Sequence, residues 1–143
     1  MLVRCLYASR AATTLSATAL DEIFVQSRRN NPHRGITGLL CFTSDVFVQV
    51  LEGGRDEVCD LYNSIVRDDR HSQVRLLAYE EIAERRFGNW TMGQVDAKTV
   101  NPSLLLKYSK TASLDPFAIT GQATMALLME LVATGSITGR AGA

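Results

Sequence analysis

The stretch of sequence that decides the fold covers residues 46–52 and reads Val46-Phe47-Val48-Gln49-Val50-Leu51-Glu52. Apolar side chains occupy its even and its odd positions, whereas a strand with one solvent-exposed face alternates apolar and polar residues. We therefore predict a strand whose two faces are both covered by other elements. Gln49 departs from this pattern. Because a buried carboxamide without partners is costly, we expect it to be hydrogen-bonded to a specific group.

The elements on either side of this strand predict an α+β, ferredoxin-like sandwich of the order βαββαβ with one further strand. We predict strands over residues 2–8, 35–44, 46–52, 74–82 and 87–95, and helices over residues 18–31 and 55–66. The strands would form a five-stranded mixed sheet with these two helices on one face. Two C-terminal helices, around residues 102–109 and 117–134, would cover the other face.

Tyr7, in the first strand, is the expected partner of Gln49. We expect the first and third strands to lie adjacent and parallel at the centre of the sheet. A contact between the phenol and the amide is then geometrically reasonable. A phenol and a carboxamide held together in a dry interior can exchange protons and hydrogen bonds with a ligand.

The composition is that of one ordinary globular domain. The chain has 143 residues, of which 46% are hydrophobic and 21% charged, and its formal net charge is zero. No overall field therefore indicates nucleic acid or an anionic membrane as a partner. There is no apolar run long enough for a spanning helix, and the N-terminus leads directly into a strand rather than a signal peptide. The three cysteines, Cys5, Cys41 and Cys59, form no CxxC motif, which favours a reduced, cytoplasmic protein.

Most familiar catalytic patterns are missing. We place the two histidines, His33 and His71, in loops without metal-ligand spacing, so no metal site is expected. The glycines of residues 35–38 lie before or within a strand and lack the third glycine of a dinucleotide-binding turn. The acidic run at residues 80–84 is interpreted as a solvated strand edge.

The remaining candidates are ordinary when taken one at a time. Gln49 alone would be a structural amide and Tyr7 a core tyrosine. Trp90 and Met92, two positions apart and so on one face of a strand, would be hydrophobic packing. Together they converge on the helix-covered face of the sheet, next to the C-terminal end of the first helix.

Several longer motifs make the chain resemble the BLUF family of blue-light sensors that use flavin, over about residues 2–95. These motifs are Tyr7-Ala8-Ser9, Ser27-Arg28-Arg29-Asn30-Asn31, Gly35-Ile36-Thr37-Gly38-Leu39-Leu40, Phe47-Val48-Gln49-Val50-Leu51-Glu52-Gly53, Asp68-Asp69-Arg70-His71 and Arg86-Phe87-Gly88-Asn89-Trp90-Thr91-Met92.

The resemblance implies that the isoalloxazine ring of FAD inserts between the two helices. Asn31 would bond the polar edge of the ring and Asn30 would take the neighbouring position, while Ile23 and Ser27 would line one wall. Three further residues would lie near the ring or the phosphate-bearing chain: Asp68, Arg70 and His71. These motifs describe the ring pocket and do not separate FAD from FMN.

The resemblance also implies roles in photochemistry. Tyr7 would donate an electron and a proton, and Gln49 would relay between Tyr7 and the flavin by turning or tautomerising its amide. Trp90 and Met92 would transmit the change to the C-terminal cover. Residues 1–95 would be the flavin-binding domain, and residues 96–143 a helical extension with a frayed tail from about 136.

The function that follows is a non-enzymatic blue-light photoreceptor. We expect it to signal through a protein partner, to form a homo-oligomer, and to bind neither nucleic acid nor a membrane. Two alternatives stay open: a small hydrolase of the acylphosphatase type, for which residues 8–12 would be a poor anion loop, and a photochemically silent flavin or interaction module. Met125 and Leu128 could either pack on the sheet or face a partner.

Overall fold

The computed structural model contains a six-stranded sheet in the order β4-β1-β3-β2-β5-β6. It describes residues 1–12, 16–134 and 137–140, without the side chains of residues 17, 24, 27, 28, 31 and 138–140. The strands are β1 (Leu2–Ala11), β2 (Thr37–Phe42), β3 (Val46–Gly54), β4 (His71–Ile82), β5 (Trp90–Asp96) and β6 (Thr138–Arg140). The α+β ferredoxin-like fold is confirmed, and β6 adds a short strand to the five that were predicted.

The central pair β1 and β3 is antiparallel, so the predicted parallel pairing is wrong. The reason is the tight connection between β2 and β3, in which Thr43 Oγ1 accepts hydrogen bonds from the amides of Asp45 (3.3 Å) and Val46 (3.0 Å). This hairpin makes β3 antiparallel to β2; because α1 returns the chain so that β2 runs in the same direction as β1, β3 is antiparallel to β1 as well. The register nevertheless places Tyr7 directly opposite Gln49.

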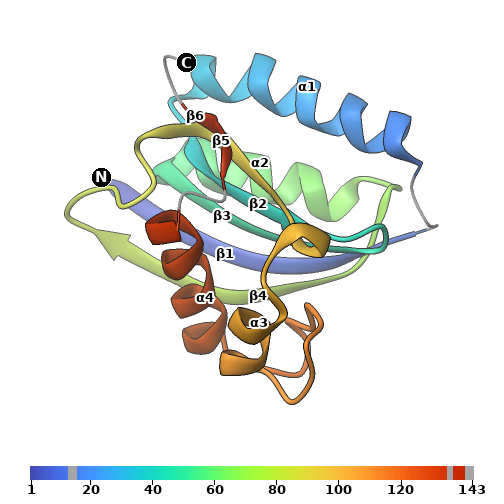
Figure 1. Cartoon of the computed structure of the whole chain (residues 1–143). Coiled ribbons are helices and arrows are strands. Elements are labelled where there is room, and N and C mark those ends of the chain that lie inside the picture. Colours follow the sequence, from blue (N-terminus) through green and yellow to red (C-terminus); the bar gives the residue numbers. More distant parts are fainter. Residues whose placement is uncertain (13–15, 135–136, 141–143) are drawn as a thin grey trace.

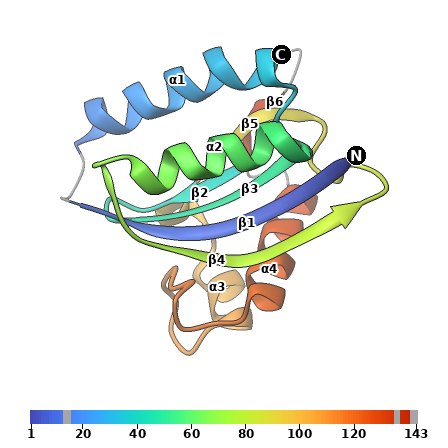
Figure 2. The same cartoon turned by 180° about the vertical axis from the view of Figure 1, so that it is seen from behind.

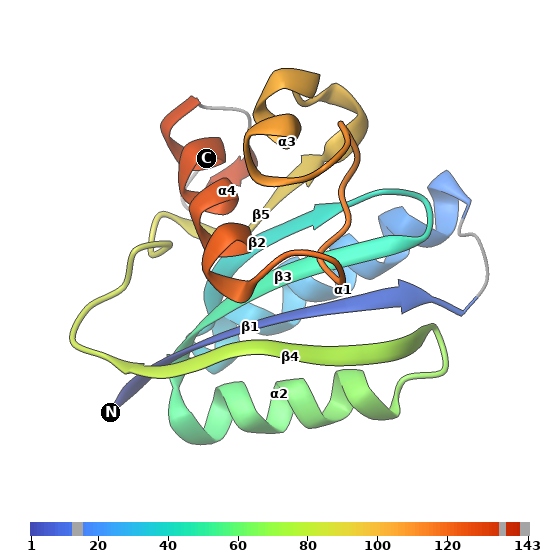
Figure 3. The same ribbon diagram turned by 90° about the horizontal axis from the view of Figure 1, so that it is seen from below.

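Helices cover both faces of the sheet, as predicted from the doubly apolar β3. Helices α1 (Ala17–Arg34) and α2 (Arg55–Arg67) lie side by side on one face (Figure 2). Helices α3 (Pro102–Tyr108) and α4 (Gly121–Thr134) lie on the other, where a short 3-10 turn, η1 (Ala97–Thr99), leads from β5 into α3 (Figures 1 and 3). The alternating residues of β3 therefore enter two separate cores: Val48 and Val50 on the α3/α4 side, Phe47 and Leu51 on the α1/α2 side.

Two helix ends differ from the predicted ones. Helix α1 continues past Asn30-Asn31-Pro32 to Arg34 and ends at Gly35, whose positive φ of 67° is the left-handed conformation that closes a helix. Helix α4 begins at Gly121 rather than near residue 117, because residues 116–119 form turns. At the C-terminus, residues 138–140 pair with β5 instead of fraying, while residues 135–136 and 141–143 of the predicted tail lie outside the described residues.

The inner face of α4 is core. Leu128 is fully buried among residues of the α3/α4-side core, and Met125 is half-buried against them. Of the two readings left open by the sequence, packing on the sheet is therefore the correct one for Leu128. Over the described residues, no helix is long and apolar enough to cross a membrane.

The cysteines are free thiols, and two of them behave as small buried hydrophobes. Burial raises the pKa of Cys5 to about 12 and that of Cys41 to about 12, so both stay protonated at neutral pH. Gly38 also has a structural role, because a Cβ at this position would lie 1.9 Å from the carbonyl oxygen of Val50. Its absence of a side chain lets β2 and β3 approach closely.

Candidate functional site

A buried chain of three side chains lies on the α1/α2 side of the sheet. The Tyr7 hydroxyl donates a hydrogen bond to Gln49 Oε1, and Gln49 Nε2 donates to Met92 Sδ at 3.2 Å. All three residues are at most 5% exposed. Burial raises the pKa of Tyr7, so the phenol keeps its proton and acts as the donor. That donor orients the amide, with its oxygen toward β1 and its nitrogen toward β5.

Trp90 and Met92 lie on opposite sides of the sheet, contrary to the prediction that they share a face. Met92 belongs to the α1/α2-side core, whereas Trp90 packs in the α3/α4-side core. The pairing of β5 with β6 has a register shift between Trp90 and Gln94, so regular strand alternation is interrupted between these two residues. Pairing with β2 begins only at Gly93, and in the turn before β5 the Trp90 amide donates to the carbonyl of Phe87 at 3.2 Å.

A cavity of about 170 Å³, partly open to solvent, lies against the Tyr7–Gln49 pair. Apolar walls alternate with polar groups, which suits a flat aromatic ligand with a polar edge. Its lining residues are Tyr7, Ile23, Gln26, Asn30, Arg34, Leu40, Phe47, Gln49, Leu61, Ser64, Ile65, Asp68, Arg70 and His71.

Six of the predicted cofactor-binding residues line this cavity: Ile23, Asn30, Gln49, Asp68, Arg70 and His71. Ser27 and Asn31 belong to α1, but their side chains lie outside the part of the chain that the structure describes. The prediction missed the lining residues Leu40, Phe47, Leu61, Ser64 and Ile65 of β2, β3 and α2. It also missed Gln26 and Arg34 of α1, which lie three residues after Ile23 and four after Asn30. Helical spacing from the predicted positions would have found both.

Asp68 and Arg70 form an ion pair at the rim of the cavity. The Arg70 guanidinium donates to both carboxylate oxygens of Asp68, at 2.6 Å from one nitrogen and at 3.0 and 3.1 Å from Nε. These hydrogen bonds lower the pKa of Asp68 and raise that of Arg70, so both stay charged. A further contact, 3.4 Å from the Arg70 guanidinium to Gln26 Oε1, links Arg70 to α1. The Asp68–Arg70 ion pair therefore links the loop before β4 to α1.

Both histidines were wrongly predicted to lie in loops. His33 lies in the last turn of α1, and His71 is the first residue of β4. His71 Nδ1 is 2.8 Å from the Ser9 hydroxyl, and its ring lies 5.3 Å from that of Phe47. Burial lowers the pKa of His71, so the neutral ring is the stable form in the folded protein. Among the described residues, no three His, Cys, Asp or Glu side chains gather to hold a metal ion.

The buried position of His71 should make the stability depend on pH. Above its ordinary pKa of 6.5 the ring is neutral in both states, and the full stability is present. As the pH falls below that value, the unfolded chain takes up a proton that the folded protein resists, so the free energy of unfolding should fall by at most about 1.4 kcal/mol per pH unit. Urea titrations between about pH 7 and about pH 5.5 would measure this slope.

A matched pair of variants tests that assignment. His71→Gln should flatten the slope, whereas His33→Gln, at an exposed position in α1, should leave it unchanged. An equal slope in His71→Gln and the unmodified protein would assign the pH dependence to other groups.

The fold and the site together define a small ligand-binding domain with a hydrogen-bonded phenol and amide at the base of its cavity. The sequence profile of the BLUF family, described as sensors of blue-light using FAD, matches residues 2–93. The chain therefore belongs to the BLUF family, whose members bind flavin.

Two curated relatives show how such domains are used in longer proteins. The photoactivated adenylate cyclase subunit beta of Euglena longa is 36% identical over 87 residues, which are 60% of this chain and 10% of that protein. The blue light- and temperature-regulated antirepressor BluF of Escherichia coli is 30% identical over 98 residues, 68% of this chain and 24% of that protein. The chain thus matches about a tenth to a quarter of these relatives.

Solved structures extend the likeness into the C-terminal helices. BlsA in its photo-activated state has a TM-score of 0.82 at 29% identity, covering 92% of this chain and 95% of that one. BlrB, a BLUF protein in its dark state, has a TM-score of 0.77 at 30% identity, covering 94% and 96%. Since the family profile ends at residue 93, this coverage extends well into the C-terminal part of the chain.

The acylphosphatase alternative finds no support. Residues 8–11 belong to β1 and do not form an anion-binding loop. The Arg10 guanidinium lies 4.3 Å from the centre of the Phe117 ring, and its Nε donates to Gln73 at 2.9 Å. Arg10 therefore fastens the C-terminal cover to the sheet.

Proposed function

We propose that this chain is a blue-light photoreceptor module that holds FAD in the cavity between α1, α2 and the sheet. The observation that carries the proposal is the hydrogen-bonded chain from Tyr7 through Gln49 to Met92 at the base of that cavity. It connects the cavity to β5, which leads into the C-terminal helices.

The cavity fits a flavin ring in its chemistry. Ile23 on α1 and the pair Leu61 and Ile65 on α2 offer apolar walls, and Asn30 offers an amide at the edge. Asn31 and Ser27 are proposed as further contacts from α1. When bound, the flavin supplies an oxidant that blue light generates. Tyr7 would lose one electron to that oxidant together with its phenolic proton, and Gln49 would relay the proton by accepting it at Oε1 while releasing one from Nε2 toward the cofactor.

Gln49 is suited to act as a switch because its head group carries one acceptor and one donor side. In the orientation described above, Tyr7 donates to the oxygen and Met92 accepts from the nitrogen. A reversed amide would turn its oxygen toward Met92, whose thioether has no proton to donate. The two orientations therefore differ in their bond to β5, and Met92 is proposed to report the difference to that strand.

We propose FAD as the cofactor, and a second, shallower groove beside the ring cavity offers room for its longer phosphate-bearing chain. It runs along the outer side of α1 and shares Gln26, Asn30 and Arg70 with the ring cavity. Arg29 also lines it, as do the carboxylates of Asp21 and Glu22, and because Arg70 is paired with Asp68 we propose Arg29 as the cation for a phosphate-bearing chain. The structure of Klebsiella pneumoniae BlrP1 with FMN has a TM-score of 0.68 at 28% identity. Which flavin nucleotide this chain binds is therefore a question for experiment.

The output is proposed to be a protein–protein contact rather than catalysis, with homo-oligomerisation as part of the assembly. This proposal is supported by the connection between the cavity and the C-terminal helices: Gln49 contacts Met92 in β5, and β5 leads into α3. The protein is proposed to work in the cytoplasm, in keeping with its free cysteines.

Visible absorption of the purified protein before and after blue light tests the function. We expect flavin bands that shift to the red on illumination and return in darkness, while a sample kept dark stays constant. Chromatography of the released cofactor should identify FAD. A flavin spectrum that does not respond to light would favour the silent module, and a protein that stays colourless after reconstitution with FAD would refute flavin binding.

A further inference from the structure

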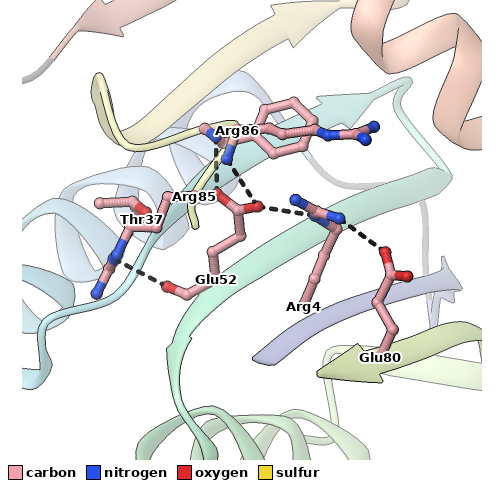
Figure 4. A network of polar contacts seen from close by, with 7 residues as sticks. Arg4, Thr37, Glu52, Glu80, Arg85 and Arg86 are labelled. Atoms are coloured by element: carbon pink, nitrogen blue, oxygen red, sulfur yellow. Dashed lines mark hydrogen bonds and ion pairs between the residues drawn. The ribbon is translucent and has the colours of Figure 1, made fainter. Parts of the chain in front are cut away.

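A row of polar residues crosses four strands on the side of the sheet away from the flavin cavity (Figure 4). Arg4 in β1 lies directly opposite Glu80 in β4 and Glu52 in β3, and Glu52 lies opposite Thr37 in β2. Glu52 is 0% exposed and Arg4 is 5% exposed. A buried carboxylate of this kind is tolerated only where charge and hydrogen-bond donors surround it.

Both oxygens of the Glu52 carboxylate are engaged. One accepts from Arg4 Nε at 2.7 Å and from the Arg86 amide at 3.1 Å, and the other accepts from the Phe87 amide at 2.7 Å. Arg4 also reaches Glu80 at 2.7 Å, but that carboxylate is largely exposed. Glu52 thus joins the centre of the sheet to the main chain of the β4–β5 loop, residues 83–89 (Figure 4).

Arg85 fastens the same loop from the other direction. Its guanidinium donates to Thr37 Oγ1 at 2.8 Å, to the Glu52 carbonyl at 3.2 Å and to the Gly35 carbonyl at 2.7 Å. Gly35 is the residue at which α1 ends. Three consecutive loop residues, 85–87, are therefore fixed to β2, β3 and the end of the first helix.

The fixed loop residues 85–87 lie shortly before Trp90, the residue that departs from strand alternation. The Phe87 amide binds Glu52, and the Phe87 carbonyl accepts from the Trp90 amide. Phe87 is itself fully buried in the α3/α4-side core, beside Trp90. The turn that leads into Trp90, just before the register shift between Trp90 and Gln94, is therefore held by Glu52.

We propose that Glu52 is a positioning residue that holds the β4–β5 loop so that Trp90 stays in the α3/α4-side core and Met92 stays against Gln49. The proposal rests on the proposed photoreceptor function for its effect on the light response. Gln49 and Glu52 are three residues apart on β3, or about 10 Å along the strand. The same strand therefore carries the switching amide and the anchor of the segment that responds to it.

Glu52→Gln tests this role, with Glu80→Gln as its matched control. The amide of the first variant replaces one acceptor oxygen by a donor, which cannot satisfy the loop amide and Arg4. The control removes the exposed partner of Arg4 without touching the loop. Trp90 is the single tryptophan of the chain, so its emission spectrum and its quenching by iodide in darkness report its position directly.

We expect Glu52→Gln to retain the flavin and the red shift, since Tyr7 and Gln49 are unchanged. Its Trp90 should become more accessible to iodide, and the rate of dark recovery should change by about fivefold or more. Glu80→Gln should match the unmodified protein in both measurements. Arg85→Ala loosens the loop while the buried pair Arg4–Glu52 stays intact, and should shift both measurements in the same direction. Unchanged measurements in this variant would overturn the dependence of Trp90 on the loop even if Glu52→Gln does not fold.

Unaltered Trp90 quenching and recovery in the folded variants would overturn the proposal. Its failure is separable from that of the photoreceptor function, because the quenching measurement is made in darkness and needs no photochemistry. A protein without any red shift would refute the photoreceptor, yet Trp90 would still report whether Glu52 holds the loop.

Discussion

Tyr7→Phe should give a protein that still binds flavin but shows no red shift on illumination. The substitution keeps the aromatic ring that packs in the core and removes only the hydroxyl that donates to Gln49 Oε1. Because phenylalanine has no hydroxyl proton, the first proton transfer of the proposed photochemistry has no donor. We therefore expect complete loss of the red shift rather than a slower response. Absorption difference spectra of the flavin-loaded variant measure this directly.

Tyr62→Phe is the matched control for that experiment. The Tyr62 ring lies edge-on to Tyr7, with ring centroids 5.7 Å apart, on the same side of the sheet. It is a neighbouring phenol that has no part in the proposed chain. The control should keep a normal red shift, and a normal photocycle in Tyr7→Phe would remove Tyr7 from the mechanism.

Gln49→Leu should also abolish the red shift, and it should destabilise the protein measurably in darkness. Leucine fills a similar volume but leaves the buried Tyr7 hydroxyl without its acceptor. An unsatisfied buried polar group costs about 1–3 kcal/mol in the free energy of unfolding. Urea unfolding in the dark would measure the loss.

The double variant Tyr7→Phe/Gln49→Leu separates the hydrogen bond from the general packing of the site. Because both polar partners are then replaced by apolar groups, the double variant should be more stable than the sum of the two single changes implies. The coupling should be about 1 kcal/mol or more. Strictly additive losses would mean that the two side chains do not stabilise each other.

The sequence alone determined the outline of the fold and the polar pair at the centre of the site. Apolar residues on both sides of β3 required a sheet covered on two faces, and helices α1/α2 and α3/α4 provide that cover. Burial of Gln49 required a partner, and Tyr7 provides it. These features are predictable because they follow from the period of a strand and from the cost of burying an unpaired amide.

The residues of the cavity wall were predictable only in part. The residues that belong to short motifs, such as Asp68, Arg70 and His71, line the cavity. Gln26 and Arg34 belong to no polar pattern that stands out in the sequence, yet they follow from helical spacing once one lining residue of α1 is known. The direction of β1 relative to β3 was wrong because it depends on how α1 returns the chain to the sheet, and local sequence does not record that path.

Only the tertiary structure decided which of Trp90 and Met92 meets Gln49. Strand periodicity assigns residues two apart to one face, and the register shift between Trp90 and Gln94, next to the turn held through Phe87, interrupts it. The bonds that hold this turn join residues 35 positions apart in the sequence, Glu52 and Phe87. Local sequence patterns predict that the side chains of a strand alternate between the two faces of the sheet. The residue at which this alternation begins is decided by contacts with distant strands, and these exist only once the chain has folded.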